Sequence, residues 1–303
     1  MGVENQFTST IEGAVFNPLT DRILTVRSLD NDLFTLPSIE LESFAGILEP
    51  KLINAFGQLT RSQIRATVNY GSKIDTTPDG SLNKLFDFRL FAADGLVSEH
   101  MADSESFDEL TYVPEVRDFL RRLFAEFKKT GTLLSALKQP MYIRPALLCR
   151  ETDQLIVPVV EDRQGKRPRS FRLEEGDHVN NILGDIIHKY IASNRKKADI
   201  ARLSADQKIL KGRQSAVPVW QMDYLFEISA RDATAIINNQ PAQSLALVTV
   251  SDSRPPRLEE SLPINCKKAI HDIAKRAMHH VITCSPTTNI EFNTRKLTGP
   301  KID

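Results

Sequence analysis

The stretch EGAVFNPLTDRILTV, residues 12–26, decides the fold, because the chain contains its pattern twice. Two short apolar runs flank a polar turn that ends at Asp21, which is typical of a half-buried β-hairpin. The stretch ALLCRETDQLIV, residues 146–157, repeats this order and has Asp153 at the end of its turn. The two aspartates are 153 − 21 = 132 residues apart, so the sequence predicts two copies of one unit.

The elements that follow each hairpin also recur. In the first half we expect strands at 33–37, 64–70, 84–92 and 110–113, a helix pattern at 48–59 containing Pro50, and a closing helix from Pro114. In the second half we expect strands at 171–173, 220–229 and 244–250, a helix at 182–191 and a closing helix from Pro263. Aligning the halves predicts equivalent buried pairs at Val15/Leu147, Leu24/Ile156, Leu36/Leu173, Phe56/Ile191 and Phe88/Tyr224.

Length and composition agree with two ordinary domains. A chain of 303 residues that is 41% hydrophobic can bury two cores, and we expect domains at 1–135 and 140–285 with a polar tail at 286–303. No apolar run approaches the roughly 18 residues of a membrane helix. Three cysteines, Cys149, Cys266 and Cys284, indicate a reducing compartment. We therefore expect a cytoplasmic protein that does not enter a membrane.

The net charge of zero hides an asymmetry between the halves. Residues 1–140 hold 14 Lys and Arg against 20 Asp and Glu, and residues 141–303 hold 25 against 19. The balance is −6 in the first half and +6 in the second. This asymmetry fits two separately solvated surfaces, an acidic domain that faces a basic one, or a basic second half that meets an anionic partner.

The order of these elements resembles the Nudix family. The residues that carry the resemblance are Leu36-Pro37 before the helix, Pro50 at its start, and Leu110 to Glu115 as a late strand and corner. The resemblance implies an α/β (α+β) fold made of two tandem α/β/α sandwich domains with mixed sheets. It also implies a metal-dependent hydrolase of nucleotide diphosphates wherever the family's glutamate signature is intact.

The glutamate signature is not intact in either half. Its Arg-Glu pair falls at Ile53-Asn54 or, shifted by one, at Asn54-Ala55, and its Glu-Glu pair falls at Gly57-Gln58 or Gln58-Leu59. The helix of the second copy offers only Asp185 and His188 as polar ligand candidates. Neutral amides give Mg²⁺ oxygen donors but no charge, so we expect no metal and no other cofactor. Enzyme activity is an open question: only an alternative in which Glu40, Glu42 or Glu49 act as rearranged ligands requires Mg²⁺.

A zinc site is not expected from the cysteines and histidines near the C-terminus. Cys266, His271, His279, His280 and Cys284 lack the paired short spacings of structural zinc sites. A closing helix with surface histidines explains them better.

Candidate binding residues fall into two groups. Glu40, Glu42 and Arg89 are candidates for contact with a nucleotide-type ligand. Contact with an anion or a partner is predicted for residues of a lengthened hairpin and for a basic segment after the second helix, which are Arg163, Lys166, Arg167, Arg169, Arg195, Lys196 and Lys197. Few aromatic residues lie among them, which disfavours stacking on a single strand of nucleic acid.

Three functions remain open from the sequence. The preferred one is a catalytically degenerate Nudix-like protein that acts as a binding or scaffold subunit for a protein partner in a larger assembly, with sensing of a nucleotide-type ligand as a further role. The first alternative is a hydrolase with rearranged carboxylates, and the second is a nucleic-acid-associated protein that uses the basic second half.

Overall fold

The structure is a computed structural model of the chain. It describes residues 8–28, 32–41, 49–76, 82–94, 96, 100–107, 111–162, 165–191, 197–211, 216–251, 254–257, 262–283 and 288–291. The chain forms two compact units, residues 1–139 and residues 140–303.

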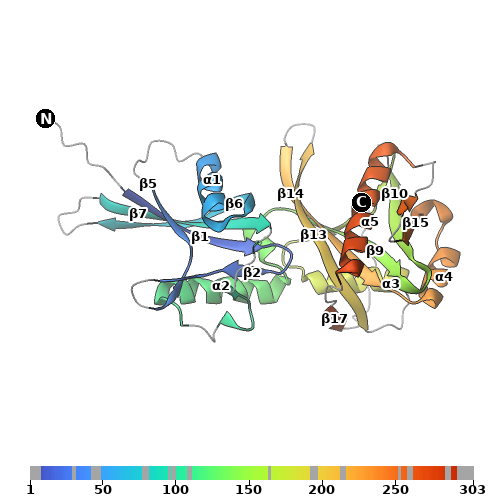
Figure 1. Cartoon of the computed structure of the whole chain (residues 1–303), viewed down its shortest axis with the longest axis horizontal. Coiled ribbons are helices and arrows are strands. Elements are labelled where there is room, and N and C mark those ends of the chain that lie inside the picture. The colour runs from blue at the N-terminus through green and yellow to red at the C-terminus, as the bar shows by residue number, and fades with distance from the viewer. Residues whose placement is uncertain are drawn as a thin grey trace. The chain divides into compact units, whose positions relative to one another are not determined.

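The first unit combines a sheet with two α-helices. Its elements are β1 (Thr8–Asn17), β2 (Arg22–Leu24), β3 (Val26–Arg27), β4 (Phe34–Thr35), β5 (Ser38–Leu41), α1 (Glu49–Thr60), β6 (Gln63–Thr76), β7 (Leu82–Asp94), β8 (Met101–Ala102), α2 (Pro114–Thr130) and the 3₁₀ helix η2 (Leu133–Leu137). In Figure 1, α1 and α2 lie on opposite faces of the sheet around β1. The predicted position of Pro50 in the first turn of its helix is confirmed.

The second unit has a longer sheet and three α-helices. Its elements are β9 (Met141–Cys149), η3 (Arg150–Thr152), β10 (Gln154–Asp162), β11 (Gly165–Pro168), β12 (Phe171–Leu173), α3 (Val179–Tyr190), β13 (Lys197–Lys211), β14 (Ala216–Glu227), α4 (Ala230–Asn239), η4 (Ala242–Ser244), β15 (Leu245–Ser251), β16 (Arg254–Arg257), α5 (Ile264–Ile282) and β17 (Thr288–Glu291). Helices and mixed sheets in both units confirm the α+β class. None of the described helices combines the length and apolar character needed to span a bilayer.

The strand order of the first sheet reappears inside the second. The first sheet runs β6-β7-β1-β2-β8, and the second contains β13-β14-β9-β10-β15 in the same arrangement. In each sheet the first strand of the hairpin pairs in parallel with the long strand, β1 with β7 and β9 with β14. The second sheet extends further, with β16 beside β15 and β17 beside β13.

The pairing register keeps a constant spacing between the units. The β1–β2 hairpin pairs Phe16 with Ile23, and 132 residues later β9–β10 pairs Leu148 with Leu155. The same spacing relates β5 to β12, because Ile39 lies opposite Ile11 and Phe171 lies opposite Ile143. The spacing read from the two turns therefore extends through three strands of each sheet.

Both hairpin turns end in an aspartate with left-handed backbone. Asp21 has φ 51° and Asp153 has φ 50°, a region that Asp adopts more readily than most residues. In the first turn, Asn17 Oδ1 accepts a hydrogen bond from Leu19 N at 2.8 Å, which is a common way for Asn to stabilise a turn. The buried Asp21 carboxylate also accepts from Leu133 N at 2.8 Å, which ties this turn to η2.

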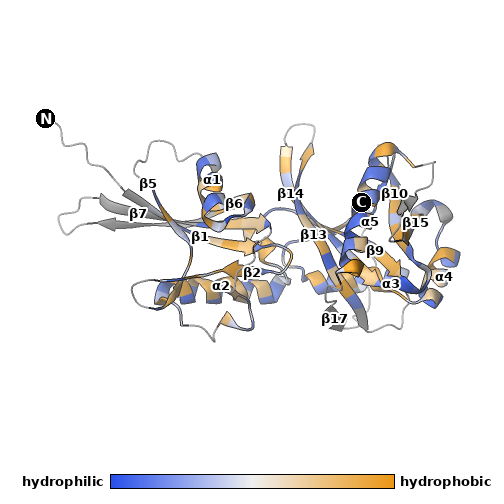
Figure 2. Cartoon of the chain, in the orientation of Figure 1, coloured by the Kyte–Doolittle hydropathy of each residue, from blue (hydrophilic) through white to orange (hydrophobic). Residues whose placement is uncertain are grey.

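Each unit buries a core on a face of its sheet. In the first unit a cluster joins α1 to the sheet, consisting of Ile11, Val15, Leu24, Leu52, Phe56, Ile64, Phe91, Ala93 and Leu96. In the second unit α5 packs on the sheet through Cys266, Ile270, Ile273, Ala274 and Ala277, over Ala146, Leu148, Leu225 and Val248. Figure 2 shows hydrophobic residues concentrated in the central strands and helices with one hydrophobic and one polar face.

The predicted core residues are buried, but three of the predicted equivalences are wrong. Every predicted core residue is buried except Phe88, whose side chain lies outside the described part of the chain. Leu173 is equivalent by register to Leu41 and not to Leu36, because β5 begins only after Pro37. The helix position of Phe56 corresponds to Ile186, and Phe88 occupies the register position of Asp223.

The late strand of the first unit was predicted in the wrong place. The strand that pairs with β2 is β8, Met101–Ala102, within a stretch where the sequence predicted no helix or strand. In the expected strand at 110–113, Tyr112 makes an isolated bridge to Phe34, and residues 108–110 lie outside the described residues. A two-residue strand has too little apolar pattern to be recognised in a sequence.

In the second unit the strands β13, β16 and β17 and the helix α4 were missed. The basic segment 194–214 contains the 15-residue strand β13, and part of the polar tail forms β17, which pairs with β13. Helix α4 begins with a capping box between Ser229 and Asp232, a signal that was present in the sequence.

Candidate functional site

Helix α1 carries two amides at positions where the resemblance to the Nudix family predicts the glutamate signature. Asn54 and Gln58 are one turn apart, and Gln58 Nε2 donates a hydrogen bond to Asn54 Oδ1 at 3.4 Å. The two amides therefore pair with each other, and neither supplies a negative charge.

The acidic candidates near α1 do not form a described cluster. Glu40 lies in strand β5 opposite Thr10, where it is exposed, and not in the acidic loop that its neighbours Glu42 and Ser43 suggest in the sequence. Glu42 lies outside the described residues, and Glu49 begins α1. Arg89 is partly buried in β7. Its backbone pairs with Gly13 of β1 and Asn69 of β6.

Helix α3 offers one carboxylate. Asp185 lies on the exposed side of the helix. The loss of some of its hydration and the negative charge of Asp177 raise its pKa, and the charge of His188 partly offsets this rise. The helix begins at His178, whose Nδ1 accepts a hydrogen bond from Asn180 N at 3.1 Å. Within the described residues no three His, Cys, Asp or Glu side chains come together as a metal site.

The cysteines and histidines of the last helix do not converge either. Cys266 is buried in the core under α5, while His271 and His279 are exposed. His280 is buried, which corrects the expectation of surface histidines, and burial lowers its pKa. Cys284 lies outside the described residues.

The basic hairpin is present as β10–β11, and only part of it can be described. Val160 pairs with Arg167 and Glu161 with Lys166, and Arg169 follows directly after β11. Arg163, Arg195 and Lys196 lie outside the described residues, and Lys197 begins β13. Of these predicted contacts, Arg169 has the most defined surroundings.

Arg169 and Lys189 pack around one aromatic ring. The guanidinium carbon of Arg169 lies 5.9 Å from the ring centre of Phe171, and the ammonium of Lys189 lies 5.6 Å from the same centre. Lys189 also lies 6.0 Å from the ring centre of Tyr190. We refer to Arg169, Phe171, Lys189 and Tyr190 as the cation cluster; it joins the end of the basic hairpin to the last turn of α3.

The cation cluster holds two like charges without a described acidic partner. Among the residues that the structure describes, neither Arg169 nor Lys189 has a carboxylate within ion-pair distance. Partial burial lowers the pKa of Lys189, and the charge of Arg169 lowers it further. Burial raises the pKa of Tyr190, and the charge of Arg169 and its hydrogen bond to the phenol oppose this rise. The arrangement keeps positive charge beside a polarisable surface, where an anion would relieve the repulsion.

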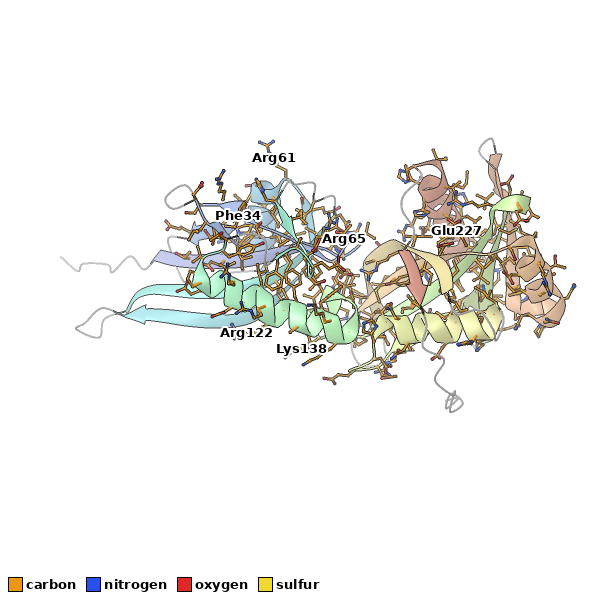
Figure 3. All side chains as sticks on the ribbon, turned by 90° about the horizontal axis from the view of Figure 1, so that it is seen from below. Phe34, Arg61, Arg65, Arg122, Lys138 and Glu227 are labelled. Atoms are coloured by element: carbon orange, nitrogen blue, oxygen red, sulfur yellow. The ribbon has the colours of Figure 1, made fainter. Side chains whose placement is uncertain are left out.

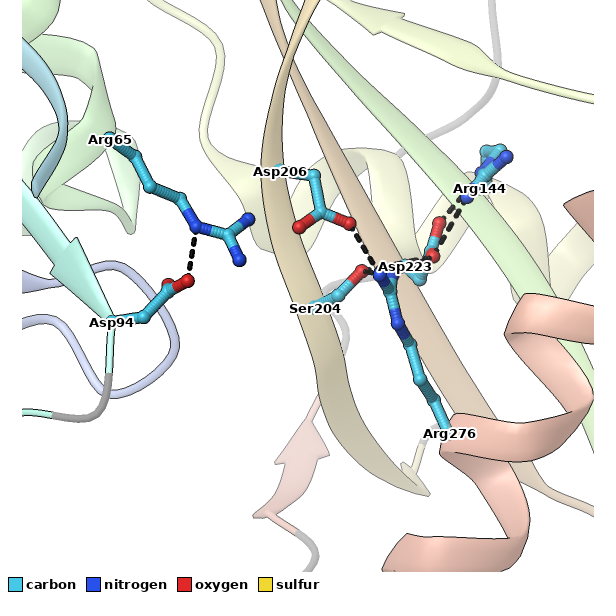
Figure 4. A network of polar contacts seen from close by, with 7 residues as sticks. All are labelled: Arg65, Asp94, Arg144, Ser204, Asp206, Asp223 and Arg276. Carbon is cyan, nitrogen blue, oxygen red and sulfur yellow. Dashed lines mark hydrogen bonds and ion pairs between the residues drawn. The ribbon is translucent and has the colours of Figure 1, made fainter. Parts of the chain in front are cut away.

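A second polar cluster, which we call the buried network, crosses three neighbouring strands of the same sheet. Arg144 of β9 donates two hydrogen bonds to Asp223 of β14, at 2.7 and 2.8 Å. Ser204 of β13 donates to the same carboxylate at 2.9 Å, and Arg276 of α5 reaches it at 3.1 Å (Figure 4). Arg276 also bonds Asp206 at 2.8 Å. Arg144 and Asp223 are 5% and 1% exposed, and two charges taken so far from water require this complete pairing.

Two further described ion pairs lie partly at the surface. Arg150 and Glu227 form a bidentate pair, and the Glu227 carboxylate (labelled in Figure 3) is partly exposed. In the first unit Arg65 pairs with Asp94 at the end of β7 (Figure 4). Such partly exposed pairs contribute little to stability and indicate no ligand.

The sequence pattern identifies Arg169 but not its neighbours in the cation cluster. Phe171 and Lys189 are 18 positions apart, and only the contact of β12 with α3 brings them together. Arg144 and Asp223 stand in two largely apolar strands, on the sheet face that packs against α5. A charge at such a position was a usable signal, because a buried charge needs a partner.

Comparison with known proteins gives no family for the chain. No protein-family model and no curated protein sequence matches it.

Proposed function

We propose that the chain is a catalytically degenerate tandem Nudix-like protein, a binding subunit that holds an anionic protein partner through its second unit. Such a protein keeps the scaffold of the family and uses it for recognition instead of hydrolysis. The resemblance in element order supports this proposal, together with the strand order that the two units share.

The observation that carries the proposal is the contrast between α1 and α3, the helices that follow β5 and β12. Hydrolysis of a diphosphate needs several carboxylates that converge on a divalent ion. Helix α1 has the amides Asn54 and Gln58 at the expected signature positions, and the only acid of α3 is Asp185, with His188 as the other candidate metal ligand. The end of α3 instead adds Lys189 to the charge of Arg169. These residues favour binding of an anion over activation of water.

A hydrolase assay tests the catalytic half of the proposal. The purified chain is incubated with nucleoside triphosphates, dinucleotide cofactors and nucleotide sugars in the presence of Mg²⁺ or Mn²⁺. We expect no turnover above the background. Steady turnover that disappears in the Glu40→Gln variant would instead identify the enzyme with rearranged carboxylates.

Capture of the partner at different salt concentrations tests the binding half. We expect a protein that co-purifies at low salt and is lost near about 0.5 M salt, because exposed charges are screened. Replacing Lys166, Arg167 and Arg169 together by Ser should weaken capture. The matched control replaces Arg121, Arg122 and Lys128 of α2 by Ser, which removes the same charge from the first unit and should leave capture intact. A gel shift with duplex or single-stranded nucleic acid that survives high salt would contradict a protein partner.

A further inference from the structure

The cation cluster has a charge and a geometry that select among anions. Two contacts hold Arg169 in place: its backbone N donates to Pro158 O at 2.8 Å, and its guanidinium packs over Phe171. Lys189 is exposed, so its ammonium is accessible from solvent. One cation is therefore fixed and the other is free to adjust to a ligand.

The total charge favours a dianion over a carboxylate. Two positive charges share the surroundings of one ring, and no described acid lies within ion-pair distance of either. A carboxylate would neutralise one of them, whereas a phosphomonoester carries about −1.5 to −2 at neutral pH. Its three terminal oxygens also suit an arginine fork together with the point charge of a lysine.

The aromatic ring argues against recognition of a nucleobase at this place. Arg169 and Lys189 both lie over the ring of Phe171, so the ring surface that a base would stack on already carries cations. The neighbouring Tyr190 is buried and offers no stacking surface. The cluster thus presents features suited to a phosphate group and none suited to a base.

The first unit shows what the same scaffold looks like without the cluster. By register Ile39 replaces Phe171, and by position in the helix Leu59 replaces Lys189 and Thr60 replaces Tyr190. Leu59 is 51% exposed. Because Leu stands in the equivalent helix at this position, the scaffold does not need a cation there.

We propose that Arg169 and Lys189 form a metal-independent binding site for a phosphomonoester group. The inference rests on the proposed function, in which this group is carried by a phosphorylated side chain of the protein partner. A free phosphate or a nucleoside monophosphate offers the same chemistry, so the test compares these sources.

The test is a titration of the full chain followed by ³¹P NMR at low salt with EDTA present. The probes are inorganic phosphate, AMP and a capped dipeptide containing phosphoserine. We expect saturable binding of the phosphoserine dipeptide. Lys189→Leu and Arg169→Gln should each weaken it about tenfold or more, since a hydrogen bond to a charged group contributes about 1.5–3 kcal/mol and 1.4 kcal/mol is tenfold.

Two control variants distinguish a specific binding site from non-specific electrostatic attraction. Arg169→Lys keeps the charge and should retain part of the affinity, whereas Leu59→Lys adds a cation to the first unit and should not increase binding. Circular dichroism and the unfolding midpoint show whether each variant is folded. Folded variants that bind phosphoserine as the wild type does would overturn the site, and so would the absence of saturation with every probe.

The sources are distinguished by relative affinity. Binding of the phosphoserine dipeptide at least as tight as that of AMP supports a phosphorylated protein. Binding of AMP more than about tenfold tighter, and still dependent on Lys189, would keep the phosphate site but overturn the protein partner of the proposed function. Failure of the inference and failure of the proposed function therefore give different results.

Discussion

Three neighbouring sheet positions that are equivalent in the two units carry different types of side chain. In the second unit Arg144, Asp223 and Ser204 lie side by side across β9, β14 and β13 and form the buried network. At the corresponding register positions the first unit has Glu12, Phe88 and Gly71, which cannot reproduce that set of hydrogen bonds. The cation cluster is likewise confined to the second unit. The same strand order accommodates either set of side chains. The sheet is therefore the scaffold that the units share, and the buried network and the cation cluster are features of the second unit.

Breaking the buried network should have the largest effect. Asp223→Leu leaves the guanidinium of Arg144 buried without its carboxylate, and we expect a loss of about 3–5 kcal/mol in the free energy of unfolding. The double variant Arg144→Met/Asp223→Leu should recover much of this loss, because Arg276 keeps its bond to Asp206. Chemical denaturation measures both. A double variant as unstable as the single one would show that the ion pair is not the source of the effect.

Replacing the two turn aspartates should give the next largest change in stability, and the two variants can be compared directly. Asp21→Ala removes the acceptor of hydrogen bonds from Leu133 N and Thr132 Oγ1 and also disfavours the left-handed backbone. We expect a loss of about 2–3 kcal/mol. Asp153 is exposed, so Asp153→Ala should cost only the backbone term, about 1 kcal/mol. Urea unfolding of both variants checks the difference; equal losses would mean that the tie to η2 contributes nothing.

Two aromatic rings of the first unit pack closely against Gly13. A Cβ at this position would lie 2.6 Å from the rings of Phe56 and Phe91, which pack with centroids 4.3 Å apart. Gly13→Ala should therefore destabilise the protein by about 1–3 kcal/mol through overpacking. Ser38→Ala, at an exposed position of the neighbouring β5, serves as the control. Thermal unfolding unchanged by Gly13→Ala would contradict the tight packing of this pair.

Lys189 should give the smallest effect on stability. Burial and Arg169 lower its pKa in the folded chain, so the unfolded chain binds the proton more tightly. The resulting cost is present at neutral pH and falls as the pH rises through the lowered pKa toward the ordinary value near 10.4. Lys189→Leu should thus be as stable as the wild type or slightly more stable, within about 1 kcal/mol, with the difference shrinking at alkaline pH. Denaturation at pH 7 and pH 10 measures this change; a clear loss of stability at pH 7 would contradict it.

Much of the scaffold could be predicted from the sequence, because local apolar patterns fix hairpins and helices. The turn at Asp21 and its copy at Asp153 gave the spacing that β1, β2 and β5 keep. Strand β13 was missed because charged residues recur along its whole length and its apolar residues show no clear alternation. The equivalence of Phe88 was wrong by one position, and in a strand such an error moves a side chain to the opposite face.

The site could be predicted only in part. Composition indicated a basic second half, and the hairpin position of Arg169 followed from its neighbours along the chain. The contact of Arg169 with Lys189 depends on how α3 packs on β12, which no local pattern encodes. The partner positions Arg144 and Asp223 likewise require the parallel pairing of β9 with β14, strands that are 79 positions apart.

The most direct test of the central claim is the unfolding midpoint of the full chain with phosphate-bearing ligands, with and without Mg²⁺. A ligand that binds the native state raises this midpoint by mass action. A binding subunit predicts a rise that is equal in EDTA and in Mg²⁺, is lost in Lys189→Leu and leaves the ligand chemically intact. A rise that requires Mg²⁺, accompanied by hydrolysis of the ligand, would contradict the account.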